Sequence, residues 1–292
     1  MGLKDKFKIL TYNIGLIEKG TDAVIEEGLV AGDIRWLKHS YKDRFFADPF
    51  LVKEDDGKYY VVCEELSFWN NKGIISLLVI NKRDFSLLEK KTLIEEPWHL
   101  SFPYIINNEY LLPESHKGGK AYLYHINVDT WEIDKKTLVC DECGFVDPII
   151  IQNTNVNNVL LSTDNSSEKL YAFKMGDDNK YHQISQSPLM IDKSRTRAAG
   201  NTFQYKESLV RPVQDCVQRY GRQTRIVKAD LLDDQTYQTE DVAVLNSDSN
   251  PPYDETFHTF NVYDNCIIVD GSKDFVRFPM KIFYRISTKL KQ

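Results

Sequence analysis

The stretch that decides the fold reads DPFLVKEDDGKYYVVCEE and runs from Asp48 to Glu65. It opens with an Asp-Pro head and an apolar strand, turns at Asp56-Gly57, and returns through a second apolar strand that ends in two acids. An Asp-Gly turn between two runs of β-branched and aromatic residues is a strong signal for a β-hairpin. Two further β-rich segments, 73–80 and 86–94, can supply outer strands, so this part of the chain predicts a four-stranded antiparallel sheet.

The same pattern of head, strand, turn and acid-ending strand returns four more times along the chain. The later heads are at Ser101, Asp147, Gly200 and His258, and the later acids are Glu114, Asp164, Asp215 and Asp270. The heads recur at roughly 45 to 60 residues, which is typical of the four-stranded blade of a β-propeller. The sequence therefore predicts an all-β fold, a five-bladed β-propeller.

The repeats predict a single domain over residues 1–292, with blades at approximately 44–94, 95–142, 143–190, 191–247 and 248–292. The fifth repeat has only three obvious strands, the last at 280–287, whereas the β-rich segment 7–17 belongs to no repeat. Because an open ring would leave long sheet edges exposed, we expect this N-terminal segment to complete the last blade as its missing strand. Residues 21–37 are expected to form a short helix or an ordered loop.

The recurring acids also separate the propeller from a β-sandwich, whose strands recur at similarly short spacing. In an antiparallel hairpin the start of the first strand lies beside the end of the second. If five such hairpins surround one axis, all heads and all acidic tails meet at one mouth of the central channel. A β-sandwich would not explain why an acid recurs at the same position in each repeat.

Polar and aromatic residues near these positions extend the predicted cluster. Those expected at the channel mouth are Asp48, Glu65, His99, Ser101, Glu114, Asp147, Asp164, Arg197, Arg211, Gln214, Asp215, His258 and Asp270. Trp98 and Tyr220 lie near strand ends, where an exposed ring can stack on a sugar. Crowded carboxyl groups raise one another's pKa while arginines keep others ionised, and this separation suits acid/base chemistry on a glycosidic bond. For any single acid the alternative is a turn cap or a surface ion pair.

Composition limits the classes of function. The chain has 292 residues, of which 42% are hydrophobic, and 37 basic against 43 acidic residues give a net charge of −6. No basic run provides the electrostatic footprint of a nucleic-acid-binding protein. No stretch approaches the ~18 consecutive apolar residues of a membrane span, and the N-terminus lacks an apolar signal-peptide core. We therefore expect no nucleic-acid partner, no membrane span, and a cytoplasmic protein or a mature form already trimmed.

Five cysteines are spread over the chain, at Cys63, Cys140, Cys143, Cys216 and Cys266. An odd number in a chain of this length argues against a disulfide framework, so we expect reduced thiols. Cys140 and Cys143 form one CxxC pair with no second pair and no HxxxH nearby, so no zinc site is expected. No cofactor is expected either, although several carboxylates in one channel leave room for a Ca²⁺ or Na⁺ ion.

Short strings in the sequence resemble a known group of propellers. Ala47-Asp48-Pro49-Phe50 and Val146-Asp147-Pro148 resemble the strand heads of five-bladed furanosidase-like glycoside hydrolases, the superfamily of the family 43 arabinanases and xylosidases. The strings 97–103, 113–115, 197–200 and 211–216 are more similar to a branch that includes the N-terminal domain of plant glucosamine inositolphosphorylceramide transferases, and bacterial relatives attached to formyltransferase-like domains. The likeness spans about residues 40 to 275.

The resemblance to the hydrolases implies that Asp48 is the general base and that an acid of the second blade tunes its pKa. The chain departs from the hydrolase pattern at two heads. The second head is Ser101, and the fourth reads Ala199-Gly200 where the hydrolases place their general-acid Glu. Glu114 or Asp215 would then be the proton donor.

Two functions follow, and the sequence leaves both open. In the first, the protein is an inverting glycosidase in which Asp48 activates water and Glu114 or Asp215 protonates the leaving oxygen. The residues expected to bind the sugar are Glu65, Trp98, His99, Ser101, Asp147, Asp164, Arg197, Arg211, Gln214, Tyr220, His258 and Asp270.

In the second, the protein is a non-catalytic glycan-binding or accessory module in the synthesis of a surface polysaccharide or glycolipid. Its ligand is then a saccharide or glycoconjugate, and its partner a glycosyltransferase or formyltransferase. A protein-interaction propeller of the WD or kelch type is disfavoured, because neither repeat signature recurs from blade to blade.

Overall fold

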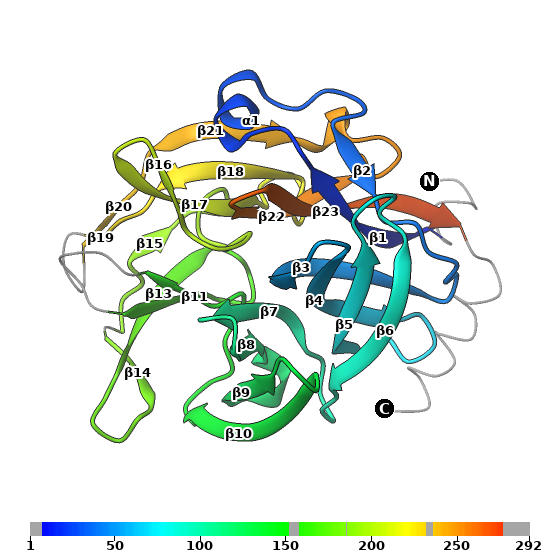
Figure 1. Cartoon of the computed structure of the whole chain (residues 1–292). Coiled ribbons are helices and arrows are strands. Elements are labelled where there is room, and N and C mark those ends of the chain that lie inside the picture. Colours follow the sequence, from blue (N-terminus) through cyan, green and yellow to red (C-terminus); the bar gives the residue numbers. More distant parts are fainter. Residues whose placement is uncertain (1–7, 152–157, 185, 232–235, 277–292) are drawn as a thin grey trace.

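The computed structural model describes residues 8–151, 158–184, 186–231 and 236–276. Its sheets stand around a central axis as five blades, as Figure 1 shows, and the predicted all-β five-bladed propeller is confirmed. One short helix, α1 (Thr21–Glu27), lies at the rim against the outer strand of the fourth blade. Within the described part of the chain, no helix is long and apolar enough to cross a membrane.

The first two blades are four-stranded sheets of consecutive strands, numbered outward from the axis. The first contains β3 (Arg44–Glu54), β4 (Lys58–Ser67), β5 (Gly73–Asn81) and β6 (Leu87–Ile94). The second contains β7 (Ser101–Ile106), β8 (Tyr110–Glu114), β9 (Ala121–Asn127) and β10 (Glu132–Cys140). A 3-10 turn over His116–Gly118 joins β8 to β9.

The third and fourth blades carry small additions to the same plan. The third contains β11 (Ile149–Ile151), β12 (Val159–Thr163), β13 (Lys169–Met175), β14 (Tyr181–Gln183) and β15 (Met190–Ile191), which also pairs with β13. The fourth contains β16 (Phe203–Tyr205), β17 (Ser208–Asp215), β18 (Gln223–Lys228) and β21 (Asp241–Asn246). Between β18 and β21 lies a two-stranded pair, β19 (Asp230–Leu231) and β20 (Tyr237–Gln238), and a 3-10 turn covers Ser247–Ser249.

The fifth blade is built from both ends of the chain. Its inner strands are β22 (Thr256–Tyr263) and β23 (Cys266–Val276), and its outer strands are β1 (Lys8–Ile17) and β2 (Ile34–Trp36). β1 pairs with β23 along its whole length, so the predicted closure by an N-terminal strand is confirmed. The N-terminal region also supplies β2, which the sequence did not indicate. The strand expected at 280–287 lies outside the described residues.

The heads of the first blades are β-bulges that hold an unusual backbone conformation. β3 and β7 both shift register beside their x-Pro head. Asp48, Phe102 and Asp147, each followed by proline, have φ of 50°, 41° and 39°. Non-glycine residues rarely adopt positive φ, and a bulge re-aims the side chain that it carries. Phe102, and not Ser101 as predicted, is therefore the second-blade equivalent of Asp48.

Aromatic side chains fill the space between neighbouring blades. Phe50 of β3 meets Phe102 of β7 edge to face, with ring centroids 5.1 Å apart. Farther from the axis, Tyr60 of β4 stacks on Trp131 at 4.9 Å. Because each blade is covered on both faces, its inner strands are almost continuously apolar, and polar groups are left mainly at the strand ends.

A substitution at Ile14 can test how much the N-terminal strand contributes to the stability of the ring. Its side chain on β1 is fully buried, in one cluster with residues of β3 and β23. We expect Ile14→Ala to lower the free energy of unfolding by about 2–5 kcal/mol in urea denaturation, as for other large-to-small core substitutions. Val30→Ala, at a position 62% exposed, is the matched control and should be nearly neutral. Equal effects of the two variants would show that the strand is dispensable.

Candidate functional site

A buried ion pair joins the last blade to the first at the channel. His258 Nδ1 lies 2.7 Å from Asp270 Oδ1 and 3.8 Å from Asp48 Oδ1. Thr259 donates its hydroxyl to Asp48 Oδ1 and its N–H to Asp270 Oδ1, both at 3.0 Å. The N–H of Asp48 donates to Asp270 Oδ2 at 2.8 Å, and the N–H of Phe102 donates to Asp48 Oδ2 at 3.1 Å. The bulge thus lets both the backbone N–H and the carboxylate of Asp48 form hydrogen bonds within this group.

Burial and charge set the protonation of this group. Burial lowers the pKa of His258, but the charge and hydrogen bond of Asp270 and the charge of Asp48 outweigh it and raise the pKa to about 9. Burial raises the pKa of Asp48 to about 6, although the positive charge of His258 acts against it. At neutral pH His258 is therefore an imidazolium, and Asp48 is close to its own titration point.

A second group connects the second, third and fourth blades through Arg197. Its Nε donates to Asp147 Oδ2 at 2.6 Å, and its terminal nitrogen donates to Glu114 Oε2 at 3.1 Å. Gln214 of β17 donates to the same oxygen of Asp147 at 2.9 Å. Burial raises the pKa of Glu114 well above its usual range, the negative charge of Asp147 adds to this, and Arg197 only partly opposes it. Arg197 thus bridges Asp147 and Glu114, and the raised pKa favours the protonated form of Glu114.

Glu64 is a third acid of the cluster that the sequence analysis did not select. Burial raises its pKa well above the usual range, and the charges of Asp48 and Glu114 raise it further. Its neighbour His99 accepts a hydrogen bond at Nδ1 from the N–H of Gly73 at 2.9 Å, so the ring proton is on Nε2, 3.4 Å from Glu64 Oε1. Burial, with a contribution from Lys117, lowers the pKa of His99 to about 4. His99 is therefore neutral at pH 7, and the raised pKa of Glu64 favours its protonated form.

Pairing within the hairpins explains why Glu64 was missed. Glu64 is opposite Ala47, the residue before Asp48, just as Glu114 is opposite Ser101, the residue before Phe102. The equivalence of Glu64 and Glu114 depends on strand pairing, because the acid follows the head proline by different numbers of residues in the two repeats. Adjacent strand residues face opposite sides, and Glu65 accordingly leaves the cluster.

Two aromatic rings flank the cluster. Tyr12 of β1 stacks on His258 with ring centroids 4.7 Å apart. The Tyr220 ring is 43% exposed, lies edge-on to His258 and has the Arg197 guanidinium 4.8 Å from its centroid. Gly221, with φ of 59°, permits this approach, because a Cβ there would lie 2.6 Å from the Cβ of His258. Tyr220 thus lies beside the cluster with part of its surface exposed, and its predicted role as a sugar-stacking platform stays a prediction.

The missing acid of the fourth head has a steric cause. Gly200 has φ of 150°, and a Cβ at this position would lie 2.4 Å from the carbonyl oxygen of Phe260 in the fifth blade. A glutamate cannot occupy this place without moving the neighbouring blade. The proton donor of any reaction in this channel must come from another blade.

Glu65 and Asp164 lie outside the cluster, contrary to expectation. Glu65 binds Lys90 at 2.8 Å, Ser76 at 2.6 Å and Arg44. Burial raises the pKa of Glu65, but these hydrogen bonds together lower it. Asp164 caps the turn after β12, where it accepts hydrogen bonds from Ser166 and from the N–H groups of residues 168 and 169. Both acids are held by local partners, as expected if they cap turns or form ion pairs near the surface.

Asp215 and Arg211 of β17 also bind neighbouring residues of the propeller and hold its strands and loops in place. Arg225 donates to Asp215 Oδ2 from Nε at 2.9 Å and from a terminal nitrogen at 2.8 Å. A carboxylate held twice by an arginine is a poor proton donor, so Asp215 does not fit the predicted role of general acid. Arg211 is fully buried and donates to the carbonyl of Arg195 at 2.6 Å and to the hydroxyl of Tyr237 at 2.8 Å. Arg211 thus fixes the backbone just before Arg197.

Trp98 and Ser101 have structural surroundings in the second blade. The Trp98 ring is half-buried, stacks on Tyr122 at 6.2 Å and covers Gly118. It is therefore packed against the blade and does not share the position of Tyr220. Ser101 is buried opposite Glu114, at the edge of the cluster.

One set of residues offers metal ligands. Asp48, His258 and Asp270 each present one ligand atom, all within 4.8 Å of one another. Thr259 and backbone N–H groups already bind the carboxylate oxygens, and a protonated imidazole has no lone pair for a metal. The imidazolium supplies the positive charge that a cation would bring. We therefore expect no resident Ca²⁺ or Na⁺ ion at this donor set.

Removal and addition of calcium test this conclusion. We expect EDTA and millimolar Ca²⁺ to leave the Tm unchanged at pH 7, because His258 already balances the two carboxylates. A cation present at a hundredfold excess over its Kd would stabilise the fold by about 2.7 kcal/mol and raise the Tm by several degrees. Differential scanning calorimetry with and without Ca²⁺ distinguishes the two cases, and a Tm that rises with Ca²⁺ concentration would contradict our assignment.

His258 should also give stability a characteristic pH dependence. Its pKa is higher in the folded protein than the unfolded value of 6.5, so its contribution is complete below about pH 6.5 and is lost as the pH rises through about 9. This difference in pKa corresponds to a contribution to the free energy of unfolding on the order of 3 kcal/mol. In urea denaturation between pH 6 and 10, His258→Gln should be less stable at pH 6 and lose less stability on going to pH 10.

His116→Gln is the matched control, because His116 is exposed on the 3-10 turn of the second blade. It should show the same pH dependence as the wild type. If His258→Gln also retained that dependence, the buried imidazolium would not be its source.

The fold and the site together define a carbohydrate-related propeller, in which five blades bring buried acids, an arginine and an aromatic ring to one channel. The family described as "Glucosamine inositolphosphorylceramide transferase 1, N-terminal" matches residues 35–254, and the chain belongs to this family. The resemblance inferred from the sequence strings is thereby confirmed.

Full-length relatives are much longer than the region they share with this chain. A glucosamine inositolphosphorylceramide transferase 1 of Arabidopsis thaliana is 28% identical over 214 residues, which are 68% of this chain and 27% of the plant protein. The protein of the same name from Oryza sativa subsp. indica is 26% identical over 208 residues, which are 68% of this chain and 28% of the rice protein. The chain thus spans about a quarter of the length of these relatives.

Two solved structures share the general arrangement at low identity. Zg3597, a family 117 glycoside hydrolase of Zobellia galactanivorans, has a TM-score of 0.45 and 11% identity, with 89% of this chain and 91% of the hydrolase covered. A luciferin-regenerating enzyme has a TM-score of 0.43 and 10% identity, with 83% of each chain covered.

Proposed function

We propose that the propeller is a carbohydrate-recognition module that holds the sugar of a glycoconjugate at the mouth of its channel. The observation that carries this proposal is the part-exposed Tyr220 set against the Arg197–Asp147 pair, with Glu114 bound to the same guanidinium. An apolar ring face next to fixed hydrogen-bond donors and acceptors is the usual composition of a sugar site.

Solvent access indicates which groups a sugar would contact. The side chains of His99 and Glu114 are 19% and 14% exposed, so both are in part open to solvent. The raised pKa of Glu114 favours the form that donates a hydrogen bond, whereas Asp147 and His99 complete a mixed set of partners. Sugar hydroxyls both donate and accept, so such a set suits them better than a row of ionised carboxylates.

Recognition is favoured over hydrolysis by the state of the candidate catalytic groups. Both oxygens of Asp48 already accept hydrogen bonds, from Thr259 and from the backbone of Phe102. Asp215 is held by Arg225, and Gly200 excludes an acid from the fourth head. The names of the relatives describe glucosamine transfer to an inositolphosphorylceramide. We therefore place the module beside a glycosyltransferase or formyltransferase, as the part that selects the glycoconjugate.

Hydrolysis of a glycosidic bond is the second candidate, and one observation favours it. Asp48, with a pKa of about 6, can act as a general base near neutral pH, and Glu114 retains a proton that it can donate. Two carboxyl groups with separated pKa values are the requirement of glycosidase chemistry. In this case Asp48 activates water and Glu114 protonates the leaving oxygen.

Asp48→Asn separates the two candidates. For a recognition module we expect no turnover of aryl glycosides by the wild type, and binding of glucosamine, myo-inositol or a related oligosaccharide that weakens by no more than about tenfold in the variant, since both oxygens of Asp48 are already bound by Thr259 and Phe102. For a glycosidase the variant would lose turnover about a hundredfold or more while binding is retained. Calorimetric titration and product analysis measure the two properties.

Asp164→Asn is the matched control, because Asp164 lies at a surface turn with its own local partners. It should change neither binding nor turnover. A wild type that binds no sugar and cleaves no glycoside would contradict both candidates, and a folded wild type must be verified by its circular dichroism spectrum.

A further inference from the structure

Two cysteines meet where the second blade leads into the third. Cys140 is the last residue of β10, and Cys143 lies in the turn that follows. Their Sγ atoms are 3.7 Å apart, which is van der Waals contact, and both thiols are free. The function proposed for the channel uses neither sulfur.

The turn allows the two sulfurs to approach each other. A disulfide holds its sulfurs about 2.05 Å apart, so the pair must close by roughly 1.7 Å. Residues 141–148 belong to no helix or strand, and the Cys143 side chain is only half-buried. A change of its rotamer therefore breaks no ladder hydrogen bond. Cys140, in contrast, is fully buried at the end of its strand.

Hydrogen bonds prepare one of the two thiols for reaction. The hydrogen bond from the Cys143 thiol lowers the pKa of Cys140 to about 6, and the N–H groups of Cys143 and Glu142 add to this effect against that of burial. The same contact between the sulfurs raises the pKa of Cys143, and burial raises it further. The pair thus holds a thiolate near neutral pH, and the thiolate is the nucleophilic form of cysteine.

A metal ion is the other common partner of a CxxC pair, but this pair lacks further ligands. Structural zinc takes four protein ligands. In the part of the chain that the structure describes, the one group of three or more His, Cys, Asp or Glu side chains close enough to hold an ion is Asp48, His258 and Asp270. The surroundings of the two cysteines therefore favour redox chemistry.

We propose that Cys140 and Cys143 form a reversible disulfide, with a peroxide as the oxidant. Hydrogen peroxide oxidises Cys143, the more exposed thiol, to a sulfenic acid and is itself reduced to water. The Cys140 thiolate then attacks that sulfur, the S–S bond forms, and hydroxide leaves and takes up a proton to give water. The two thiols together lose two electrons, which the peroxide gains. A dithiol reverses the reaction by thiol–disulfide exchange.

The two residues between the cysteines contact the third blade. Asp141 Oδ2 lies 2.6 Å from Lys180 Nζ, and Glu142 Oε1 lies 3.1 Å from His182 Nδ1. His182 belongs to β14, and Lys180 comes directly before it. The turn that the disulfide would close is therefore attached to the outer edge of the next blade.

The residues after the pair contact the second blade beside the channel. The N–H of Ser115 donates to the carbonyl of Phe145 at 3.0 Å. Gly144 passes so close that a Cβ there would lie 2.3 Å from the carbonyl oxygen of Ser115. Glu114 precedes Ser115, and Asp147 is two residues beyond Phe145. A disulfide in this turn would restrain the backbone that leads to both acids, and only an effect on sugar binding would rest on the proposed function.

Thiol counting tests whether the disulfide forms. After stoichiometric hydrogen peroxide on the folded wild type, we expect two of the five thiols to be lost, peptide mapping to join Cys140 to Cys143, and dithiothreitol to restore both thiols. Cys143→Ser should form no disulfide. Cys216→Ser is the matched control, because Cys216 is also half-buried, and it should still lose two thiols. Five thiols that persist in the wild type, or oxidation of Cys143 without a bond to Cys140, would overturn the proposal.

Hydrogen exchange tests whether the disulfide restrains the connection between the blades. We expect the amides of Ser115 and Val146 to exchange at least about threefold more slowly in the oxidised wild type, because local opening is restricted. The Ser115 N–H donates to Phe145, and the Val146 N–H donates to the hydroxyl of Ser162 at 2.9 Å. Equal exchange of these amides in the two redox states would refute the restraint.

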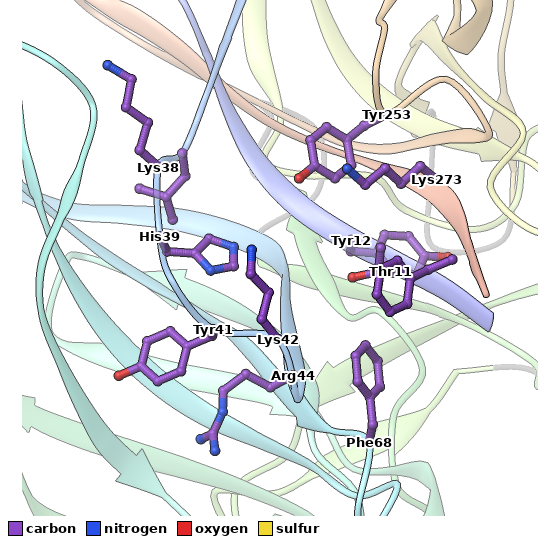
Figure 2. A pocket seen from close by; sticks show the side chains of 12 residues that line it. Thr11, Tyr12, Lys38, His39, Tyr41, Lys42, Arg44, Phe68, Tyr253 and Lys273 are labelled. Carbon is purple, nitrogen blue, oxygen red and sulfur yellow. The ribbon is translucent and has the colours of Figure 1, made fainter. Parts of the chain in front are cut away.

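The amides of Leu37 and Lys38 are the internal control. Both residues line the cavity of about 360 Å³ between the fifth and the first blade that Figure 2 shows. Their N–H groups donate to the carbonyls of Ile14 and Phe85, away from the cysteines, and should exchange equally in both states. Neither measurement involves sugar, so a failure of the proposed function would leave both expected results unchanged.

Discussion

The buried contact of His258 with Asp270 and Asp48 closes the ring at the seam between the last blade and the first. The N–H of Asp48 donates to a carboxylate 222 residues later in the chain, and Thr259 links the same two acids. Two buried carboxylates could not remain so near each other without a positive charge, and the imidazolium provides it. The bulge at Asp48, the closure of the fifth blade and the charge balance of the channel all depend on this contact.

Arg197 has the corresponding role on the opposite side of the channel. It comes from the segment before the fourth blade, and it binds Asp147 of the third blade and Glu114 of the second. The residues best placed to contact a ligand are therefore the residues that hold neighbouring blades together. A substitution in the channel changes blade packing and ligand binding at once, so stability must be measured beside affinity. Glu64 and Glu114, whose pKa values are raised, contribute least to the charge balance of the channel.

The sequence predicted the ring and most of the channel because both follow from a repeated hairpin. Asp-Pro heads and acidic tails pointed to Asp48, Glu114, Asp147 and Asp270, and the structure brings these together with Arg197, Gln214, Tyr220 and His258. An error of one residue in the second strand replaced Glu64 by Glu65, because neighbouring strand residues face opposite sides. The bond from Arg225 to Asp215 joins adjacent strands, and the contact of Tyr12 with His258 joins the two ends of the chain. Local patterns carry no signal for such partners.

The construction of the fifth blade has a consequence for synthesis of the protein. β1 leaves the ribosome before the other strands of the ring, but its partner β23 follows more than two hundred residues later. Until then β1 has an unpaired edge, and a nascent chain with such an edge is prone to aggregation. The same late strands carry His258 and Asp270, so Asp48 gains its positive partner only when the ring closes. A chain that stops before β22 has neither a closed fold nor a balanced site, and quality control therefore encounters it as an open sheet rather than as a folded but inactive protein.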